Sequence, residues 1–317
     1  MKFRTEVDIK ESAKKIEIED KIFSIGSCFA SEMSDLLHQG QLQTVNNPFG
    51  TLFNPFSINN AIQRLHDSHF YEEEDLITFN DEFISLDHHT KFDTRYIHQT
   101  LDKINGHLEE GNLFLQDTNW VIITYGTSFI YEFQPKNKLV ANCHKIPQKF
   151  FNKRLLTHQE ITDSIYQTIF SLKDICKENV QILFTVSPVR HTKDGMMENQ
   201  LSKSKLISAV HEAISGIENC HYLPVYEILM DDLRDYRFYK EDMIHPNSQA
   251  VQYIFDKFGA AYFAEDTKEF IKENFKIHKA LQHRTADEKD PKYVDFREKL
   301  KQRIEAQQKK VKHKIFQ

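Results

Sequence analysis

The sequence predicts an α/β protein of three layers, in which a doubly wound parallel sheet lies between two layers of helices. Short, continuously apolar runs alternate with segments whose apolar residues recur at helical spacing, a pattern typical of parallel strands buried on both faces. The runs end at glycine or proline, which stop strands. Of the 317 residues, 40% are hydrophobic and 12% aromatic, enough for a substantial core. This composition excludes disordered and fibrous proteins.

The first half of the chain contains two of the predicted strands. Residues 22–25 form an apolar run that ends at Gly26 and leads into a helix. The apolar face of that helix is formed by Ala30, Met33, Leu36 and Leu37. Residues 121–124 form a second run, ended by Gly126. Residues 54–119 are less regular, and we expect them to form an irregular insertion over one end of the sheet.

The second half continues the alternation. A helix is predicted from the spacing of Ile161, Ile165, Ile169 and Leu172. A strand over 182–186 follows and stops at Pro188; a helix over about 201–214 and a strand near 222–225 come next. The last helix starts near Asn247, and its apolar face is formed by Val251, Ile254, Phe255 and Phe258. Because sites in parallel sheets form at the carboxyl ends of strands, we expect the functional residues there.

Residues 1–283 are assigned to one α/β domain and residues 284–317 to a charged, helical tail. The tail has 11 Lys or Arg against 6 Asp or Glu, on a chain whose net charge is −6. Apolar residues at spacings of four, seven and four give it an amphipathic pattern: Leu300, Ile304, Val311 and Ile315. The pattern fits a basic helix that binds a protein partner or a membrane surface. It also fits a solvated helix that packs back on its own domain, which we favour.

Charge and cysteine content limit the partners and the compartment. With 41 basic and 47 acidic residues, the chain lacks the clustered positive charge of a nucleic-acid-binding protein. The four cysteines are too scattered for a disulfide scaffold and form no CxxC pair, which indicates reduced thiols in a cytoplasm. The first residues do not read as a signal peptide, and no run of 18 apolar residues occurs, so no membrane span is expected.

Ser27 directly follows the first predicted strand and begins a helix. Such a turn exposes the hydroxyl for nucleophilic attack, while nearby backbone N–H groups can stabilise an oxyanion. The structural alternative is that Ser27 only caps the helix. A nucleophile also needs a base and a group that orients the base. Asp242 and His245 offer both in one loop, so we predict a catalytic triad of Ser27, His245 and Asp242.

Two further groups of polar residues stand out. One group follows the strand over 182–186 and is expected to line a substrate pocket: Arg190, His191, Asn199 and Lys203. The other is the adjacent pair His88 and His89, which invites a metal interpretation. Adjacent residues on a strand point to opposite faces, so we predict no metal site.

Five short blocks follow one another along the chain: residues 26–30 (GSCFA), 47–50 (NPFG), 142–145 (NCHK), 187–191 (SPVRH) and 242–246 (DMIHP). With these blocks, the sequence from about residue 23 to 258 resembles the GSCFA-domain family. That family is similar to the SGNH hydrolase superfamily of GDSL-like esterases and acyltransferases. The resemblance implies an SGNH-like α/β/α fold.

The first block leaves two candidates for the nucleophile. In SGNH hydrolases this block usually reads Gly-Asp-Ser, with the serine as nucleophile. Here it reads Gly26-Ser27-Cys28, so the alignment makes Cys28 a rival, because a thiol at a helix N-terminus is activated by the helix dipole. The alternative for Cys28 is a small buried hydrophobic residue. We expect Ser27 to face the pocket and Cys28 to pack inward.

The resemblance also implies an oxyanion site. Gly50 resembles the second-block glycine, whose N–H helps to bind an oxyanion. The third block normally supplies Gly-x-Asn; here Gly126 is kept and Ser128 stands where the asparagine would be. Asn142 is the alternative donor, and it could equally pin a loop.

The implied function is a serine esterase or acyltransferase that acts on a small-molecule ester, with an acylated carbohydrate as the class suggested by the family. No cofactor is expected. The alternative is a ligand-binding module on the same fold, catalytically silent because the first and third blocks deviate from the pattern.

Overall fold

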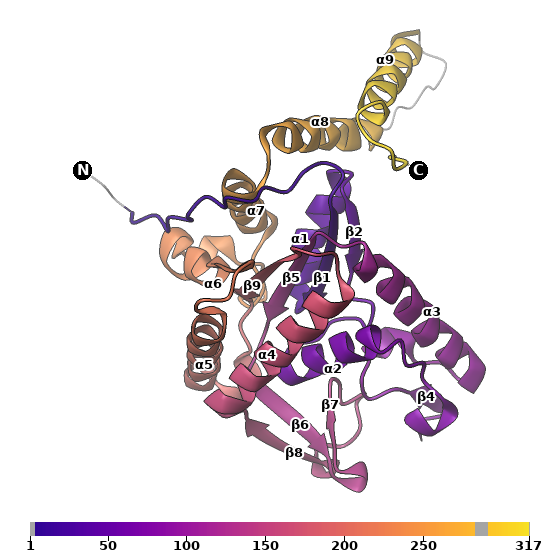
Figure 1. Ribbon diagram of the computed structural model, residues 1–317, viewed down its shortest axis with the longest axis vertical. Helices are drawn as coiled ribbons and strands as arrows, with labels where there is room; N and C mark the ends of the chain where they lie inside the picture. Colours follow the sequence, from indigo (N-terminus) through magenta and orange to yellow (C-terminus); the bar gives the residue numbers. More distant parts are fainter. Residues whose placement is uncertain (1–3, 283–290, 317) are drawn as a thin grey trace.

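The computed structural model describes residues 4–282 and 291–316 and has the predicted α/β fold (Figure 1). Its centre is a five-stranded parallel sheet in the order β10-β9-β5-β1-β2. The strands of this sheet are β1 (Lys21–Gly26), β2 (Gln43–Asn46), β5 (Trp120–Tyr125), β9 (Gln181–Val186) and β10 (Cys220–Leu223). Every one except β2 was predicted from its sequence.

Helices cover both faces of the sheet, which gives the three predicted layers. One face carries α2 (Pro55–His66), α3 (Ile97–Gln116), α4 (His158–Ile175) and α5 (Met196–Ile214). The other carries α1 (Cys28–Gln39), α7 (Ser248–Tyr262) and α8 (Glu265–Leu281), and α6 (Val225–Glu227) is a single turn after β10. Alternate strand residues feed the two cores: Phe23 and Ile25 pack on the first face, and Ile22 on the second.

The order of the parallel strands marks where a site should form. The chain passes from β1 outward to β2, then crosses to β5 on the other side of β1 and continues to β9 and β10. This is a doubly wound topology, and its direction reverses between β1 and β5. Helices that leave neighbouring strands toward opposite faces open a crevice at that point. The carboxyl ends of β1 and β5 therefore define the expected binding position.

Two small antiparallel sheets lie outside the central sheet. Strands β6 (Phe129–Phe133), β7 (Lys138–Val140) and β8 (Phe151–Leu155) form one, and β3 (Ile77–Phe79) pairs with β4 (Glu82–Ile84) in the other. The expectation of an irregular insertion over 54–119 is only partly right, because this segment contains α2 and α3 (Figure 1). Both helices bury an apolar stripe in the main core, so they belong to the α/β layers.

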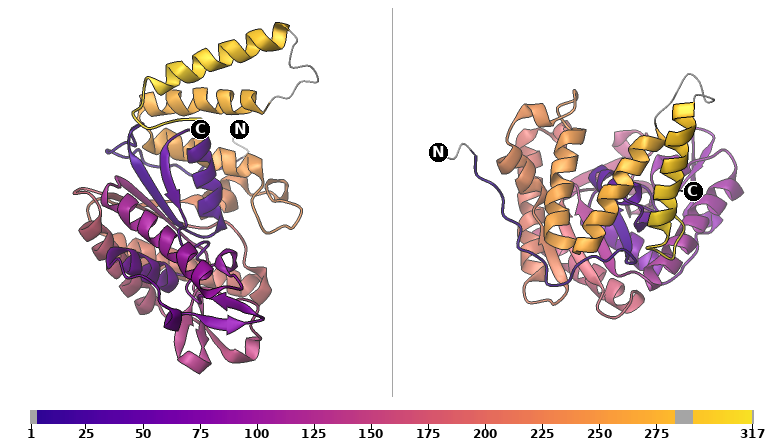
Figure 2. Two further views of the ribbon diagram at one scale, coloured as in Figure 1. Left: turned by 90° about the vertical axis from the view of Figure 1, so that its right-hand side faces the viewer. Right: turned by 90° about the horizontal axis from the view of Figure 1, so that it is seen from above.

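The tail forms α9 (Pro291–Gln308), which packs against α8 at one end of the molecule (Figure 2). Arg303 pairs with Glu273 of α8 at 2.7 Å, and the side chain of Gln307 donates to the Phe270 carbonyl. Val311 and Ile315, beyond the helix, are buried in the core under α1 and α7. The tail thus packs back on its own chain, as favoured from its sequence. Within the described ranges, no helix is long and apolar enough to cross a membrane.

Candidate active site

The turn from β1 into α1 carries two nucleophilic side chains, Ser27 and Cys28, at the carboxyl end of β1. Gly26 pairs with Thr124 of β5 and has φ +142°, a conformation that suits glycine. A Cβ at Gly26 would lie 2.2 Å from the Thr124 carbonyl oxygen, so no other residue fits there without moving the backbone. The N–H of Ser27 donates to the same carbonyl at 2.9 Å. Cys28 then begins the helix.

Asn47 holds this turn from the neighbouring strand. Its side-chain oxygen accepts the Gly26 N–H at 2.7 Å, and its amide nitrogen donates to Ser31 Oγ of α1 at 3.0 Å. Asn47 is buried and adopts φ 47°, a left-handed conformation that asparagine tolerates better than most residues. Asn47, the first residue of the 47–50 block, therefore fixes the position of the 26–30 block. Its side chain bridges the end of β1 and the first turns of α1.

Ser27 and Cys28 differ in exposure. Ser27 is 1% exposed and occupies the N-cap position of α1, but its Oγ makes no capping or other hydrogen bond within the described chain. Cys28 is half-buried. Cys28 packs against the apolar core that α1 and α7 cover, as expected, and whether Ser27 or Cys28 is the nucleophile stays a prediction.

The thiol of Cys28 lies among groups with opposing effects on its ionisation. Burial raises the pKa of the thiol. The N–H groups of Cys28 and Phe29 and the positive charge of Lys203 act in the other direction. These two N–H groups belong to the first turn of α1, where backbone donors have no intrahelical acceptor. A thiol in this position is protonated at neutral pH and needs a base to become a nucleophile.

The predicted hydrogen bond between Asp242 and His245 is present. Asp242 Oδ2 lies 2.7 Å from His245 Nδ1, while Oδ1 accepts the N–H groups of Ile244 and His245 at 2.8 and 3.0 Å. The His245 N–H, followed by its ring and the Ile244 N–H, holds the pKa of Asp242 below its usual range. Since Asp242 engages Nδ1, the ring nitrogen that remains to accept a proton is Nε2.

Two contacts hold the Asp242–His245 loop against the segment after β9 and against α1. The N–H of Arg190, just after β9, donates to the Ile244 carbonyl at 3.2 Å. On the other side, Lys240 Nζ pairs at 2.8 Å with Glu32 Oε1, one turn after Cys28 on α1. The loop is therefore tied both to the carboxyl end of the sheet and to the helix that carries the thiol. No direct hydrogen bond joins Ser27 and His245, since Ser27 Oγ has no partner in the described residues.

His191 lies next to Gly126, at the end of β5. Its backbone N–H donates to the side chain of Asn199 at 2.9 Å, and its ring stands edge-on to Phe53. A Cβ placed on Gly126 would lie 3.3 Å from His191 Nε2, so the imidazole sits directly over the end of β5. Burial lowers the pKa of His191 to about 3, which leaves the ring neutral at physiological pH. Its Nε2 is buried without a partner among the described residues.

Lys203 lies at the carboxyl ends of β5 and β9. From the sequence it was predicted only to line a substrate pocket. Its ammonium donates to the carbonyls of Gly126 and Ser187, each at 2.6 Å, at the ends of β5 and β9. The side chain is fully buried, and burial lowers its pKa to about 7. A sequence signal was present, because Lys203 falls one turn before Leu206 on the apolar face of α5. A lysine at a core position is rare without a partner.

The other groups that were predicted to bind an oxyanion make hydrogen bonds within the protein instead. The Gly50 N–H donates to the Asn47 carbonyl at 2.7 Å in a tight turn, so the idea that it points into the pocket is wrong. The hydroxyl of Ser128 lies against Ser202 of α5, buried behind β5. The side chain of Asn142 accepts the His144 N–H at 2.9 Å and thus pins its own loop. The Gly126 N–H donates to the Phe53 carbonyl.

Metal ligands do not gather in the described part of the chain, where no three His, Cys, Asp or Glu side chains form a cluster suited to a metal ion. His88 is buried, stacks on Phe49 and contacts Ser85 Oγ through Nδ1 at 2.8 Å. His89 packs instead under Gly50, whose Cβ position would clash with it. The two histidines therefore support the fold of the 47–50 turn.

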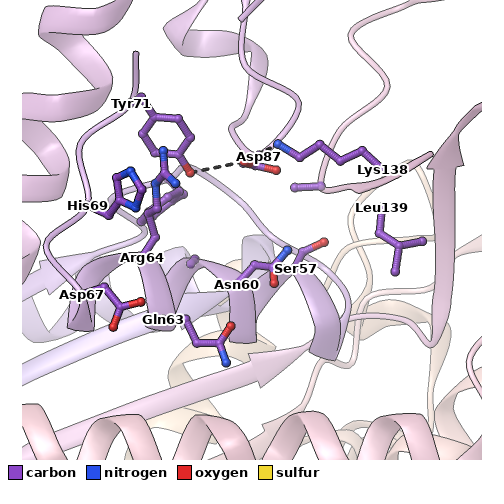
Figure 3. Close-up of a pocket in the computed structure, with 13 residues that line it drawn as sticks. Ser57, Asn60, Gln63, Arg64, Asp67, His69, Tyr71, Asp87, Lys138 and Leu139 are labelled. Carbon is purple, nitrogen blue, oxygen red and sulfur yellow. Dashed lines mark hydrogen bonds and ion pairs between the residues drawn. The ribbon is translucent and has the colours of Figure 1, made fainter. Parts of the chain in front are cut away.

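A separate polar cavity of about 310 Å³ runs along α2 (Figure 3). Lys138 pairs with Asp87 at 2.7 Å, and the Tyr71 hydroxyl donates to the same carboxylate at 3.4 Å. Arg64 stacks over the Tyr71 ring and pairs with Asp75 at 2.8 Å. Both cations are neutralised within this network, which indicates that it joins α2 to the neighbouring loops.

Comparisons with known proteins give one family match and several distant structural neighbours. The model of the GSCFA family matches residues 21–258. A comparison with curated proteins finds no match.

Three solved structures cover most of the chain. A candidate platelet activating factor from Streptococcus pneumonia is 11% identical, with a TM-score of 0.41, and covers 77% of this chain and 84% of its own. A carbohydrate esterase family 2 enzyme plus carbohydrate binding domain from Corynascus thermopiles (Myceliophthora fergusii) is 11% identical, with a TM-score of 0.39. The match covers 79% of this chain and 67% of that chain. A carbohydrate esterase family 3 protein from Talaromyces cellulolyticus is 8% identical, with a TM-score of 0.38. The match covers 80% of this chain and 99% of that chain.

Proposed function

The chain belongs to the GSCFA family, and we propose that it is an acyl-ester hydrolase or acyltransferase whose nucleophile is Cys28. One observation carries the proposal. A half-buried thiol begins α1 at the carboxyl end of β1, and the loop of an Asp242-oriented His245 is tied to the same helix. Nucleophile, base and orienting carboxylate are the three parts of an acyl-transfer site. Ser27 remains the rival nucleophile, but its burial argues against it.

The chemistry follows from the roles of these groups. His245 Nε2 takes the thiol proton as Cys28 Sγ attacks the acyl carbonyl and forms a carbon–sulfur bond. The tetrahedral intermediate collapses, the carbon–oxygen bond to the alcohol breaks, and His245 returns the proton to the leaving oxygen. Water or a second alcohol then attacks the thioester, again with His245 as base, and the thiol is regenerated. Asp242 keeps the imidazole in the tautomer that exposes Nε2 throughout.

The start of α1 is the best-placed source of oxyanion stabilisation. The N–H groups of Cys28 and Phe29 have no intrahelical acceptor and sit at the positive end of the helix dipole. The N–H of Gly50 and the hydroxyl of Ser128 are bonded elsewhere and have no part in this proposal. Met243, two residues before His245 in the same loop, is an exposed apolar side chain. It suits the acyl part of an ester, and a sugar hydroxyl is the proposed alcohol.

Turnover of activated esters tests this function. Purified protein incubated with 4-nitrophenyl esters of increasing acyl length should release nitrophenolate catalytically, and an added polyol should divert part of the acyl group to a new ester. Heat-denatured protein provides the background rate. Absence of release above that background for every acyl length, together with specific binding of an acylated sugar, would favour the silent binding module.

A further inference from the structure

Arg190, in the block that follows β9, carries a positive charge that no carboxylate of the described residues neutralises. The residue is half-buried. Its guanidinium donates to the Met243 carbonyl at 3.4 Å, and the other described contacts of this side chain are with the rings of Tyr236 and Tyr239. A guanidinium stays charged at physiological pH and offers five N–H donors in a planar fork. The charge of Arg190 is therefore available to an anion from outside the chain.

Two tyrosine rings hold the guanidinium in place. Its central carbon lies 4.0 Å from the centre of the Tyr239 ring and 5.2 Å from the centre of the Tyr236 ring. Tyr239 is 8% exposed, and its N–H donates to the Tyr236 carbonyl at 3.0 Å. Stacking on an aromatic face leaves the edge of the fork free, and that edge matches the oxygens of a carboxylate or a phosphate. Because Arg190 is already held, it loses less conformational freedom on binding than an unsupported arginine.

A cavity of about 200 Å³ adjoins this cation. Its walls include Arg190, Arg234 and Asp235 together with the two tyrosines. Arg234 pairs with Asp231 at 3.4 Å, and Asp235 pairs with Arg237 at 3.7 Å, so the charges of Arg234 and Asp235 are each matched by a neighbour. Arg190 therefore supplies the net positive charge of the wall. Pockets for whole drug-sized ligands measure about 300–1,000 Å³, so this cavity suits one charged group of a larger molecule.

Arg190 is also joined to the loop that carries the proposed base. Its backbone N–H donates to the Ile244 carbonyl at 3.2 Å, while its side chain donates to the Met243 carbonyl. The segment that follows the tyrosines is joined to the same loop, because the Lys240 N–H donates to the His245 carbonyl at 2.7 Å. An anion held by Arg190 therefore lies next to the residues that directly precede His245.

We propose that Arg190, supported by Tyr236 and Tyr239, binds an anionic group of the substrate, a carboxylate or a phosphate, beside the His245 loop. The inference rests on the proposed function and deepens it, since it makes the substrate an acyl ester that carries a negative charge. Two parts of an ester can supply this charge, a dicarboxylic acyl group or a phosphorylated sugar alcohol. Binding at a group remote from the reacting carbonyl stabilises ground state and transition state alike, so it acts on KM.

Pairs of esters that differ only in charge test the inference and separate the two sources. The 4-nitrophenyl monoester of glutarate is compared with 4-nitrophenyl pentanoate, and mono-acetylated glucose 6-phosphate with mono-acetylated glucose. In the wild type, the charged member of at least one pair should have a kcat/KM at least about tenfold higher, through a lower KM. In Arg190→Met this advantage should fall by about tenfold or more, the effect of losing a hydrogen bond to a charged group. The pair that shows the advantage identifies the source of the charge.

Arg237→Met is the matched control. Arg237 is exposed and does not line the cavity, so its loss should change the ratio between charged and neutral esters by less than about twofold, because exposed charges are screened by solvent and salt. The neutral ester of each pair corrects for any general loss of activity or folding. Equal kcat/KM for the charged and neutral esters of both pairs in the wild type would overturn the inference and leave the proposed function standing. A loss in Arg237→Met as large as in Arg190→Met would also overturn it.

A direct binding measurement avoids any change in stability at Arg190. Inorganic phosphate and glutarate are titrated into the wild-type protein at constant ionic strength, and nitrogen-15 NMR follows the Nε–H groups of arginine. The Arg190 signal is assigned by its absence in Arg190→Met. We expect a saturable shift of this signal, with either anion, that the Arg237 signal does not share. Linear shifts common to both arginines would contradict the site. A saturable shift in a protein that turns over no ester would instead remove the proposed function and leave the anion site standing.

Discussion

Cys28→Ala lowers kcat/KM for ester turnover by at least about a thousandfold, whereas Ser27→Ala leaves it within about threefold; removal of a nucleophile typically has effects of this size or larger. The reason is the difference in position. Cys28 is half-buried at the start of α1, beside the loop that carries the base. The Ser27 hydroxyl is buried beneath the helix and has no hydrogen-bond partner within the described residues. Steady-state kinetics of the two variants measures the difference.

The Ser27→Ala variant is its own folding control. Its hydroxyl satisfies no described partner, so alanine should leave thermal stability unchanged or slightly raised, because an unsatisfied buried polar group is removed. The opposite kinetic pattern, an inactive Ser27→Ala and an active Cys28→Ala, would return the nucleophile to Ser27 and make Cys28 structural.

His245→Ala should lower kcat by about a hundredfold to ten-thousandfold, the usual range for loss of a general base. Asp242→Asn should have a comparable effect of up to about ten-thousandfold, because the amide presents a donor to Nδ1 and favours the wrong tautomer. The hydrogen bonds from His245 and Ile244 keep Asp242 ionised, so its orienting role is present above the normal carboxyl pKa and is lost only as the pH falls well below it. Steady-state kinetics of the two variants at neutral pH measures these losses, and a wild-type profile extended below pH 4 follows the loss of the orienting role.

His158→Ala is the matched control for the histidine variants. His158 also contacts a carboxylate, Glu212 at 2.7 Å, but on the exposed faces of α4 and α5. Its loss should leave kcat unchanged. Full activity in folded His245→Ala would show that another group is the base.

Sequence periodicity predicts most of the central sheet and fails where a strand lies at its edge. β1, β5 and β9 are continuously buried, and their apolar runs identify them. β2 contains Gln43, Thr44 and Asn46, and all its residues are only half-buried, so no apolar run marks it. The start of the last helix near Asn247 was also predicted, and the Asn247 side chain accepts the Ala250 N–H there.

The candidate site is predictable where it depends on local spacing. Asp242 and His245 lie three residues apart in one loop, and their hydrogen bond follows from that spacing. The burial of Ser27 and the half-burial of Cys28 depend on the elements packed around the turn, which no local pattern reveals. The hydrogen bond that the Gly50 N–H donates to the Asn47 carbonyl likewise depends on the geometry of the turn. Lys203 acquires its position only when β5 and β9 come together.

Locating the acyl group on the enzyme tests the central claim, that acyl transfer passes through Cys28. Protein mixed with an activated ester is quenched in acid within the first turnovers, digested and sequenced by tandem mass spectrometry. Fragmentation separates Ser27 from Cys28, and neutral hydroxylamine releases a thioester but spares an oxygen ester. The account predicts an acyl group on Cys28 that hydroxylamine removes. A hydroxylamine-resistant acyl group on Ser27, or turnover with no acyl group on either residue, would contradict it.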